Sequence, residues 1–120
     1  MTLPDLQAKL ADFADQRSWT QFHTPKNLVM ALSGEVGELT EIFQWLTDDQ
    51  ARDLVHDPQA KANVAQELAD VFAYLLRLAD VLNVDLPTAL ENKITVNQER
   101  YPVDKAHGHA RKYDSLDRQL

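Results

Sequence analysis

Hydrophobic residues recur at helical spacing along most of this chain, and short polar stretches separate the segments. In the first segment Leu6, Leu10 and Phe13 form an apolar stripe, which predicts a helix over about residues 4–16. Similar patterns predict helices over about residues 25–46, 57–82 and 86–99, with a short helical turn near residues 50–55. We therefore expect four main helices and no sheet, an all-α fold.

Helix start and stop signals support these boundaries. Thr24-Pro25 and Asp57-Pro58 each combine an N-cap residue with proline at the first helical position. Asp85 is placed to cap the fourth helix, which should end before Tyr101-Pro102 because a proline disfavours helical conformation in the preceding residue. We expect residues 1–103 to form one domain and residues 104–120 to form a polar C-terminal tail.

Length, charge and cysteine content narrow the possible functions. The 120 residues, 44% hydrophobic and 26% charged, are typical of one soluble globular domain. A net charge of -7 argues against sequence-independent nucleic-acid binding, which needs clustered lysine and arginine. There is no bilayer-length apolar stretch and no amino-terminal signal core, so we expect a cytoplasmic protein without a membrane partner. The absence of cysteine excludes disulfides, thiolate metal sites and cysteine nucleophiles.

Two pairs of acidic residues lie on the apolar sides of the second and third predicted helices. Glu35 and Glu38 are three residues apart, as are Glu67 and Asp70, so each pair shares one helix face. A Glu-x-x-Glu pair usually belongs to a solvated surface. Here Glu35 and Glu67 fall within apolar arcs, where unpaired charge is costly. A bound cation would remove that cost, so the two pairs predict a metal site between the helices.

The ligand types indicate which metal this site would hold. Carboxylate oxygens alone favour Mg²⁺, with Mn²⁺ as a substitute. A di-iron centre is the competing interpretation, but it typically uses a Glu-x-x-His pair, and no histidine follows these carboxylates by three residues.

Aromatic residues near the acidic pairs are candidates for binding a nucleobase. Trp19, Phe22 and His23 precede the second helix, while Trp45 and Tyr74 follow the two acidic pairs along their helices. Bases stack on aromatic faces, so these side chains could enclose a base while the ion holds phosphates. The alternative is that Trp45 and Tyr74 belong to the hydrophobic core and that His23 is structural.

The fourth predicted helix carries a polar stripe. Lys93, Asn97 and Arg100 follow one another at intervals of four and three residues, so they share a face. They could contact phosphate oxygens. On spacing alone, an ordinary solvated face explains them better.

Taken together, these motifs resemble those of the MazG-like all-α nucleoside triphosphate pyrophosphohydrolases. Within that family the chain is most similar to the branch of small dCTP pyrophosphatases. The resemblance covers about residues 5–103 and implies a four-helix MazG-like bundle completed by oligomerisation. It rests on Trp19–Leu28, Gly34–Leu39, Phe43–Trp45, Glu67–Val71 and Asp85-Leu86.

The resemblance also implies roles for individual residues. The metal ligands, which are also the catalytic groups, would be Glu35, Glu38, Glu67 and Asp70. Residues enclosing the deoxycytidine would be Trp19, Gln21, Phe22, His23, Trp45 and Tyr74, with Lys93 and Asn97 near the phosphates. Leu10 departs from the pattern, because related dCTP enzymes can have a substrate-contacting histidine there.

The resemblance implies a Mg²⁺-dependent hydrolase that cleanses the nucleotide pool. Water would attack the α-phosphorus of a deoxynucleoside triphosphate, dCTP or a modified dCTP, and release pyrophosphate and the monophosphate. Two alternatives stay open: a pyrophosphohydrolase for another nucleotide, such as another dNTP or phosphoribosyl-ATP, and a non-catalytic helical module that binds nucleotide or metal. The expected partners are the nucleotide and further copies of the chain, in a dimer or tetramer.

Overall fold

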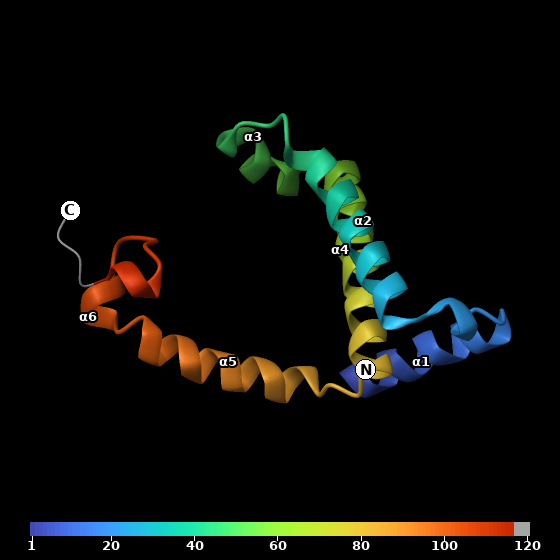
Figure 1. Ribbon diagram of the computed structural model, residues 1–120. Coiled ribbons are helices and arrows are strands. Elements are labelled where there is room, and N and C mark those ends of the chain that lie inside the picture. Colours follow the sequence, from blue (N-terminus) through green and yellow to red (C-terminus); the bar gives the residue numbers. More distant parts are fainter. Residues whose placement is uncertain (117–120) are drawn as a thin grey trace. The chain divides into compact units, whose positions relative to one another are not determined.

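The computed structural model describes residues 1–116, and all of the regular structure in that range is helical (Figure 1). The chain divides into two units, one comprising Met1–Val84 and the other beginning at Asp85. None of the helices in the described range is long and apolar enough to cross a membrane. The all-α prediction is confirmed.

The first unit contains three main helices and several short ones. The main helices are α1 (Leu3–Gln16), α2 (Pro25–Phe43) and α4 (Pro58–Val81). Between them lie the 3-10 turn η1 (Thr20–Phe22), the short helix α3 (Asp48–Asp53) and the 3-10 turn η2 (Leu54–His56). The turn expected near residues 50–55 is therefore α3 with η2. α2 ends two residues before Trp45, earlier than the hydrophobic pattern suggested.

Local capping fixes the segment that leads into α2. The Thr24 side chain accepts a hydrogen bond from the Asn27 backbone N–H at 3.3 Å, as its N-cap position predicts. The Asn27 side chain donates to the Phe22 carbonyl at 3.0 Å, and the Trp19 N–H donates to the Ala14 carbonyl at 2.8 Å. These bonds hold residues 19–23 between the end of α1 and the start of α2.

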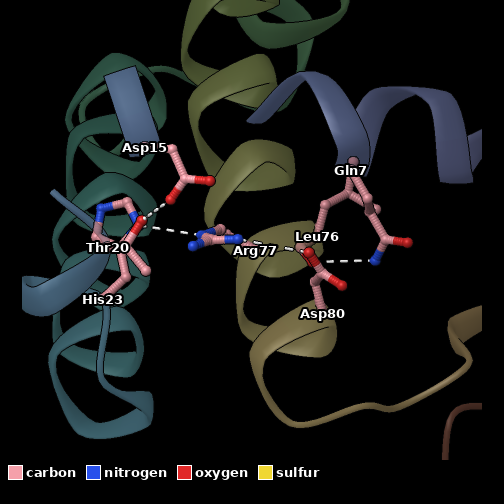
Figure 2. Close-up of polar contacts among 7 residues, drawn as sticks. All are labelled: Gln7, Asp15, Thr20, His23, Leu76, Arg77 and Asp80. Atoms are coloured by element: carbon pink, nitrogen blue, oxygen red, sulfur yellow. Dashed lines mark hydrogen bonds and ion pairs between the residues drawn. The ribbon is translucent and has the colours of Figure 1, made fainter. Parts of the chain in front are cut away.

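The core of the first unit is formed by α4 against both α2 and α1. α2 and α4 lie side by side and run in opposite directions (Figure 1). Leu28 and Leu76 are almost completely buried where these helices meet their neighbours, as are Ala14 and Ala79. The Gln7 side chain donates to the Leu76 carbonyl at 3.1 Å, which ties α1 to α4 (Figure 2).

Large apolar side chains nevertheless stay exposed on α2 and α4. Met30, Leu68, Phe72 and Leu75 each expose more than a third of their surface in the single chain. Burying apolar surface is the main favourable term in folding and association. These faces are therefore available to a further partner.

The second unit contains α5 (Leu86–Arg100), α6 (Val103–Ala106) and the 3-10 turn η3 (Tyr113–Ser115). Tyr113 packs edge-to-face on Tyr101, with ring centroids 6.2 Å apart, and the Arg100 guanidinium lies 4.5 Å from the Tyr113 ring centroid. Leu116 is buried. Residues 104–116 of the predicted tail thus contain short helical turns, while residues 117–120 lie outside the described part.

Candidate active site

Carboxylates of α2 and α4 converge where the two helices pack. Glu35 and Glu38 of α2 and Glu67 of α4 each place one oxygen in a group whose members all lie within 4.8 Å of one another. The antiparallel contact of the helices and the three-residue spacing on α2 produce this arrangement. We call Glu35, Glu38 and Glu67 the acidic cluster.

The surroundings of the acidic cluster fit a cation. The Oε2 atoms of Glu35 and Glu67 are buried and have no hydrogen-bond partner. Ion pairs in the first unit, Arg52 with Asp49 and Arg77 with Asp80, lie elsewhere. Buried acceptors without donors are costly, so three oxygens gathered in this way suit a hard divalent cation.

The same burial and crowding of like charge raise the pKa values of two residues of the acidic cluster. Desolvation raises the pKa of Glu35, the hydrogen bond that its protonated carboxyl can make with Glu38 raises it further, and the charges of Glu38, Asp70 and Glu67 act in the same direction. The pKa of Glu67 is also raised, first by desolvation and then by the charge of Glu38. Without a cation, both groups therefore hold their protons to higher pH than an ordinary glutamate.

Asp70, the fourth predicted ligand, lies slightly apart from the cluster. Its carboxylate is not in the group within 4.8 Å, but its charge raises the pKa of both Glu35 and Glu67. Glu41 also raises the pKa of Glu67, a contribution that the sequence analysis missed. Its position three residues after Glu38 on α2 was the available signal.

A cavity of about 180 Å³ adjoins this region. Its walls come from α1, from the segment before α2 and from α4, and most of the lining is apolar or aromatic. Asp70 lines the cavity, and its charge also acts on Glu35 of the acidic cluster. The full lining is Leu10, Phe13, Trp19, His23, Asp70, Ala73, Tyr74 and Arg77.

The structure brings some of the predicted base-binding residues together. Trp19, His23 and Tyr74 line the cavity. Trp19 also packs edge-to-face on Phe13, with centroids 5.8 Å apart and an interplanar angle of 70°. This contact holds one aromatic wall in place.

Other predicted site residues lie outside the cavity lining. The Gln21 side chain donates to the Ser18 carbonyl at 2.9 Å, and Phe22 is 59% exposed. Trp45 lies beyond the end of α2 and is 86% exposed. Lys93 and Asn97 are exposed residues of α5, in the second unit.

The sequence analysis missed Ala73 and Arg77 as cavity residues and treated Phe13 only as part of an apolar stripe. Ala73 and Arg77 follow Asp70 by three and seven residues, so all three share one face of α4. That spacing was a usable signal. On α1, the resemblance had already pointed to the position of Leu10, whereas the place of Phe13 in the lining depends on tertiary packing and had no comparable signal.

Arg77 is buried, with 8% of its surface exposed, and it joins two parts of the first unit (Figure 2). Its Nε donates to Nδ1 of His23 at 3.1 Å, and its Nη1 donates to the Asp80 carboxylate at 3.4 Å. Desolvation lowers the pKa of His23, and the Arg77 charge lowers it further. A hydrogen bond thus joins two cavity residues, His23 and Arg77, that lie 54 positions apart in the sequence.

Comparison with known proteins identifies the family. The profile of the MazG-like family matches residues 30–116. This chain is a member of the MazG-like family. It is 46% identical to dCTP pyrophosphatase 1 of Rattus norvegicus over 117 residues, 98% of this chain and 69% of that protein. The human dCTP pyrophosphatase 1 is also 46% identical, over 115 residues, which cover 96% of this chain and 68% of the human protein.

A solved structure supports the same conclusion for the MazG-like fold. A pyrophosphatase from Archaeoglobus fulgidus is 40% identical and superposes with a TM-score of 0.77, covering 82% of this chain and 91% of that one. The resemblance inferred from the motifs is therefore confirmed. The names of these relatives agree with the expected activity of a nucleotide pyrophosphohydrolase.

Proposed function

We propose that this MazG-like chain is a Mg²⁺-dependent pyrophosphohydrolase that converts dCTP, or a modified dCTP, and water into the monophosphate and pyrophosphate. The observation that carries the proposal is the position of Asp70. It lines a cavity with aromatic walls and also acts electrostatically on the acidic cluster. A base in the cavity would therefore have its phosphates beside the carboxylates.

The acidic cluster and Asp70 would hold the metal ion. Their ligands are all oxygen atoms, which favours Mg²⁺ and allows Mn²⁺ as a substitute. When bound, such an ion supplies charge neutralisation for the triphosphate and lowers the pKa of water. The unpartnered Oε2 atoms of Glu35 and Glu67 are the local feature that favours a metal over a hydrogen-bonded network.

The chain's own groups would orient the reactants. Glu38 is the exposed member of the acidic cluster, and we assign it the role of accepting a hydrogen bond from the attacking water. The water oxygen bonds to the α-phosphorus, and the bond from that phosphorus to the bridging oxygen breaks. Pyrophosphate leaves, and the water's proton passes through Glu38 to solvent. No covalent intermediate is required.

The cavity has room for a pyrimidine. A cavity of about 150 Å³ suffices to bind benzene, so a cavity of about 180 Å³ has room for one six-membered ring. Trp19 and Tyr74 would supply stacking surface, and the dCTP specificity named in the relatives supports cytosine.

We also propose a homo-oligomer, either a dimer or a tetramer. The exposed apolar residues of α2 and α4, including Met30 and Phe72, favour burial against another copy. In such an assembly, residues that lie outside the cavity of their own chain would contact the substrate bound to another copy. These would be Gln21, Phe22 and Trp45, with Lys93 and Asn97 at the phosphates.

With a net charge of -7, we expect no nucleic-acid partner. The cytoplasmic location and the domain boundary near residue 103 remain predictions.

The direct test is an assay of the purified chain with dCTP and Mg²⁺, measuring pyrophosphate and dCMP. We expect equal amounts of both products and strong losses for Glu38→Gln and Asp70→Asn. Glu99→Gln, an exposed acid of α5, is the matched control and should retain activity. Bound but intact dCTP would favour the non-catalytic module. Faster hydrolysis of another nucleotide in a panel would favour the alternative substrate.

A further inference from the structure

The contact between Arg77 and His23 constrains which atoms of the cavity can donate hydrogen bonds. An arginine guanidinium has only donors and stays protonated in proteins. Its Nε–H approaches His23 Nδ1 at 3.1 Å, so Nδ1 must be the acceptor and carry a lone pair. The ring hydrogen of His23 must then be on Nε2.

Two further observations make this constraint relevant to a ligand. His23 and Arg77 both line the cavity of about 180 Å³. In residues 1–84, no hydrogen bond engages Nε2 of His23. Nε2–H is therefore a donor that remains available for a bound molecule, while Arg77 keeps Nδ1 occupied.

Arg77 is itself held in position. It is 8% exposed, and its second contact, from Nη1 to Asp80 at 3.4 Å, orients the guanidinium plane from the other side. Figure 2 shows Arg77 between His23 and Asp80, with α4 providing both Arg77 and Asp80. A buried, doubly anchored arginine can enforce one histidine tautomer more strictly than a solvated partner could.

From this geometry we infer that Arg77 is a positioning residue that locks His23 with its hydrogen on Nε2, so that the cavity selects bases that present an acceptor to that hydrogen at N3. N3 of cytosine is such an acceptor. Uracil and thymine share the O2 acceptor with cytosine but carry a hydrogen on N3, so their N3 edge would meet the Nε2–H donor with a second donor. The inference rests on the proposed function, because it assumes that a nucleobase occupies this cavity.

Two substitutions separate the hydrogen bond from simple packing. Arg77→Met places a methyl carbon near the position of Nε and removes the donor. Arg77→Gln places an amide near that position, which can donate to Nδ1 without the positive charge, although its oxygen can instead accept from a hydrogen on Nδ1. If Arg77 acts through the hydrogen bond, Arg77→Gln should rescue part of what Arg77→Met loses.

The first readout is the tautomer of His23, from two-bond ¹⁵N–¹H correlations in NMR spectra of the wild-type chain. We expect the hydrogen on Nε2 in the wild type, a mixture of tautomers in Arg77→Met, and a larger Nε2–H fraction in Arg77→Gln than in Arg77→Met. This measurement needs no turnover, so it stands even if the chain does not hydrolyse dCTP. A wild-type spectrum with the hydrogen on Nδ1 would overturn the inference, whether or not either variant folds.

The second readout is the ratio of the dissociation constants for dUMP and dCMP, measured by titration without Mg²⁺. The wild type should favour dCMP, and Arg77→Met should reduce that preference by about tenfold, the upper part of the range for one hydrogen bond. Arg77→Gln should recover part of the preference. An unchanged ratio in a folded Arg77→Met variant would refute the selective role. Failure to release pyrophosphate from dCTP would instead count against the proposed function.

Discussion

Neutralising Glu35 should make the metal-free protein more stable and at the same time weaken its response to Mg²⁺. Glu35 is the member of the acidic cluster with a buried, unpartnered Oε2 and with several like charges nearby. Glu35→Gln keeps the shape of the side chain, removes its charge and adds a donor for the neighbouring carboxylates. Comparing this variant with the wild type therefore shows how much the charge of Glu35 destabilises the folded protein and whether the response to Mg²⁺ needs that charge.

The size of the effect follows from the spacing of the cluster. Its oxygens lie within 4.8 Å of one another, and Glu35 and Glu38 are both members. Two like charges at that distance repel by about 1 kcal/mol in bulk water and by about 3 kcal/mol at an effective dielectric constant of 20. Glu38 is exposed, so solvent screening places the gain near 1–2 kcal/mol. For a chain of this size, that gain corresponds to a rise in Tm of roughly 3–8 °C.

The assay is thermal unfolding of the wild type and Glu35→Gln, first in EDTA and then in Mg²⁺. The wild type should gain about 3 kcal/mol when Mg²⁺ is near 100 times its Kd, since ligand binding to the folded state adds RT ln(1 + [L]/Kd). Glu35→Gln should start higher in EDTA and gain much less. Glu99→Gln controls for net charge. A lower Tm of Glu35→Gln in EDTA, or an undiminished Mg²⁺ response, would refute this reasoning.

Three other predictions concern pH, the cavity and the core. Because the pKa of Glu35 is raised in the folded state, the wild type loses stability as the pH rises from the ordinary glutamate range through that raised value. In EDTA, Glu35→Gln should therefore exceed the wild type in stability by more at pH 8 than at pH 5. A difference in stability that does not change with pH would be inconsistent with the raised pKa. Trp19→Ala should raise the Kd for dCMP by roughly 5–150-fold, because base stacking contributes about 1–3 kcal/mol; a titration showing no change would exclude Trp19 as a wall of the base site. Leu76→Ala should lower the free energy of unfolding by about 2–5 kcal/mol, because Leu76 is 1% exposed; a loss below 1 kcal/mol in denaturant unfolding would show that the core lies elsewhere.

Local signals in the sequence predicted the helices well. Thr24 and Asp57 act as N-caps as expected, since a cap depends only on residues within the next turn. The end of α2 was placed too late because Trp45 and Leu46 continued the apolar pattern after the backbone had left the helix. Periodicity records which face is apolar, and it locates helix ends less well than capping residues do.

The candidate site was predictable to the extent that it depends on helix faces. The spacing of Glu35, Glu38 and Glu67 within apolar arcs pointed to a cluster, and the structure places their oxygens together. The contact of Arg77 with His23 spans 54 residues and depends on the register of α4 against the segment before α2. No periodicity within one helix contains that information.

The exposed apolar faces of α2 and α4 show another limit of sequence reasoning. Leu68 and Phe72 of α4 are both apolar, and both are more than 40% exposed in the single chain. A hydrophobic pattern indicates that a residue should be covered but does not distinguish cover by the same chain from cover by another copy. Sedimentation of the purified chain would show which applies, and a monomer at all concentrations would contradict the proposed oligomer.

The most direct test of this account is an anomalous difference map from crystals grown with Mn²⁺ and a non-hydrolysable dCTP analogue. We predict a Mn²⁺ peak among the carboxylates of Glu35, Glu38 and Glu67, with the cytosine in the cavity lined by Trp19 and His23. A Mn²⁺ peak at another place, or these carboxylates directed into solvent with the nucleotide bound elsewhere, would contradict it.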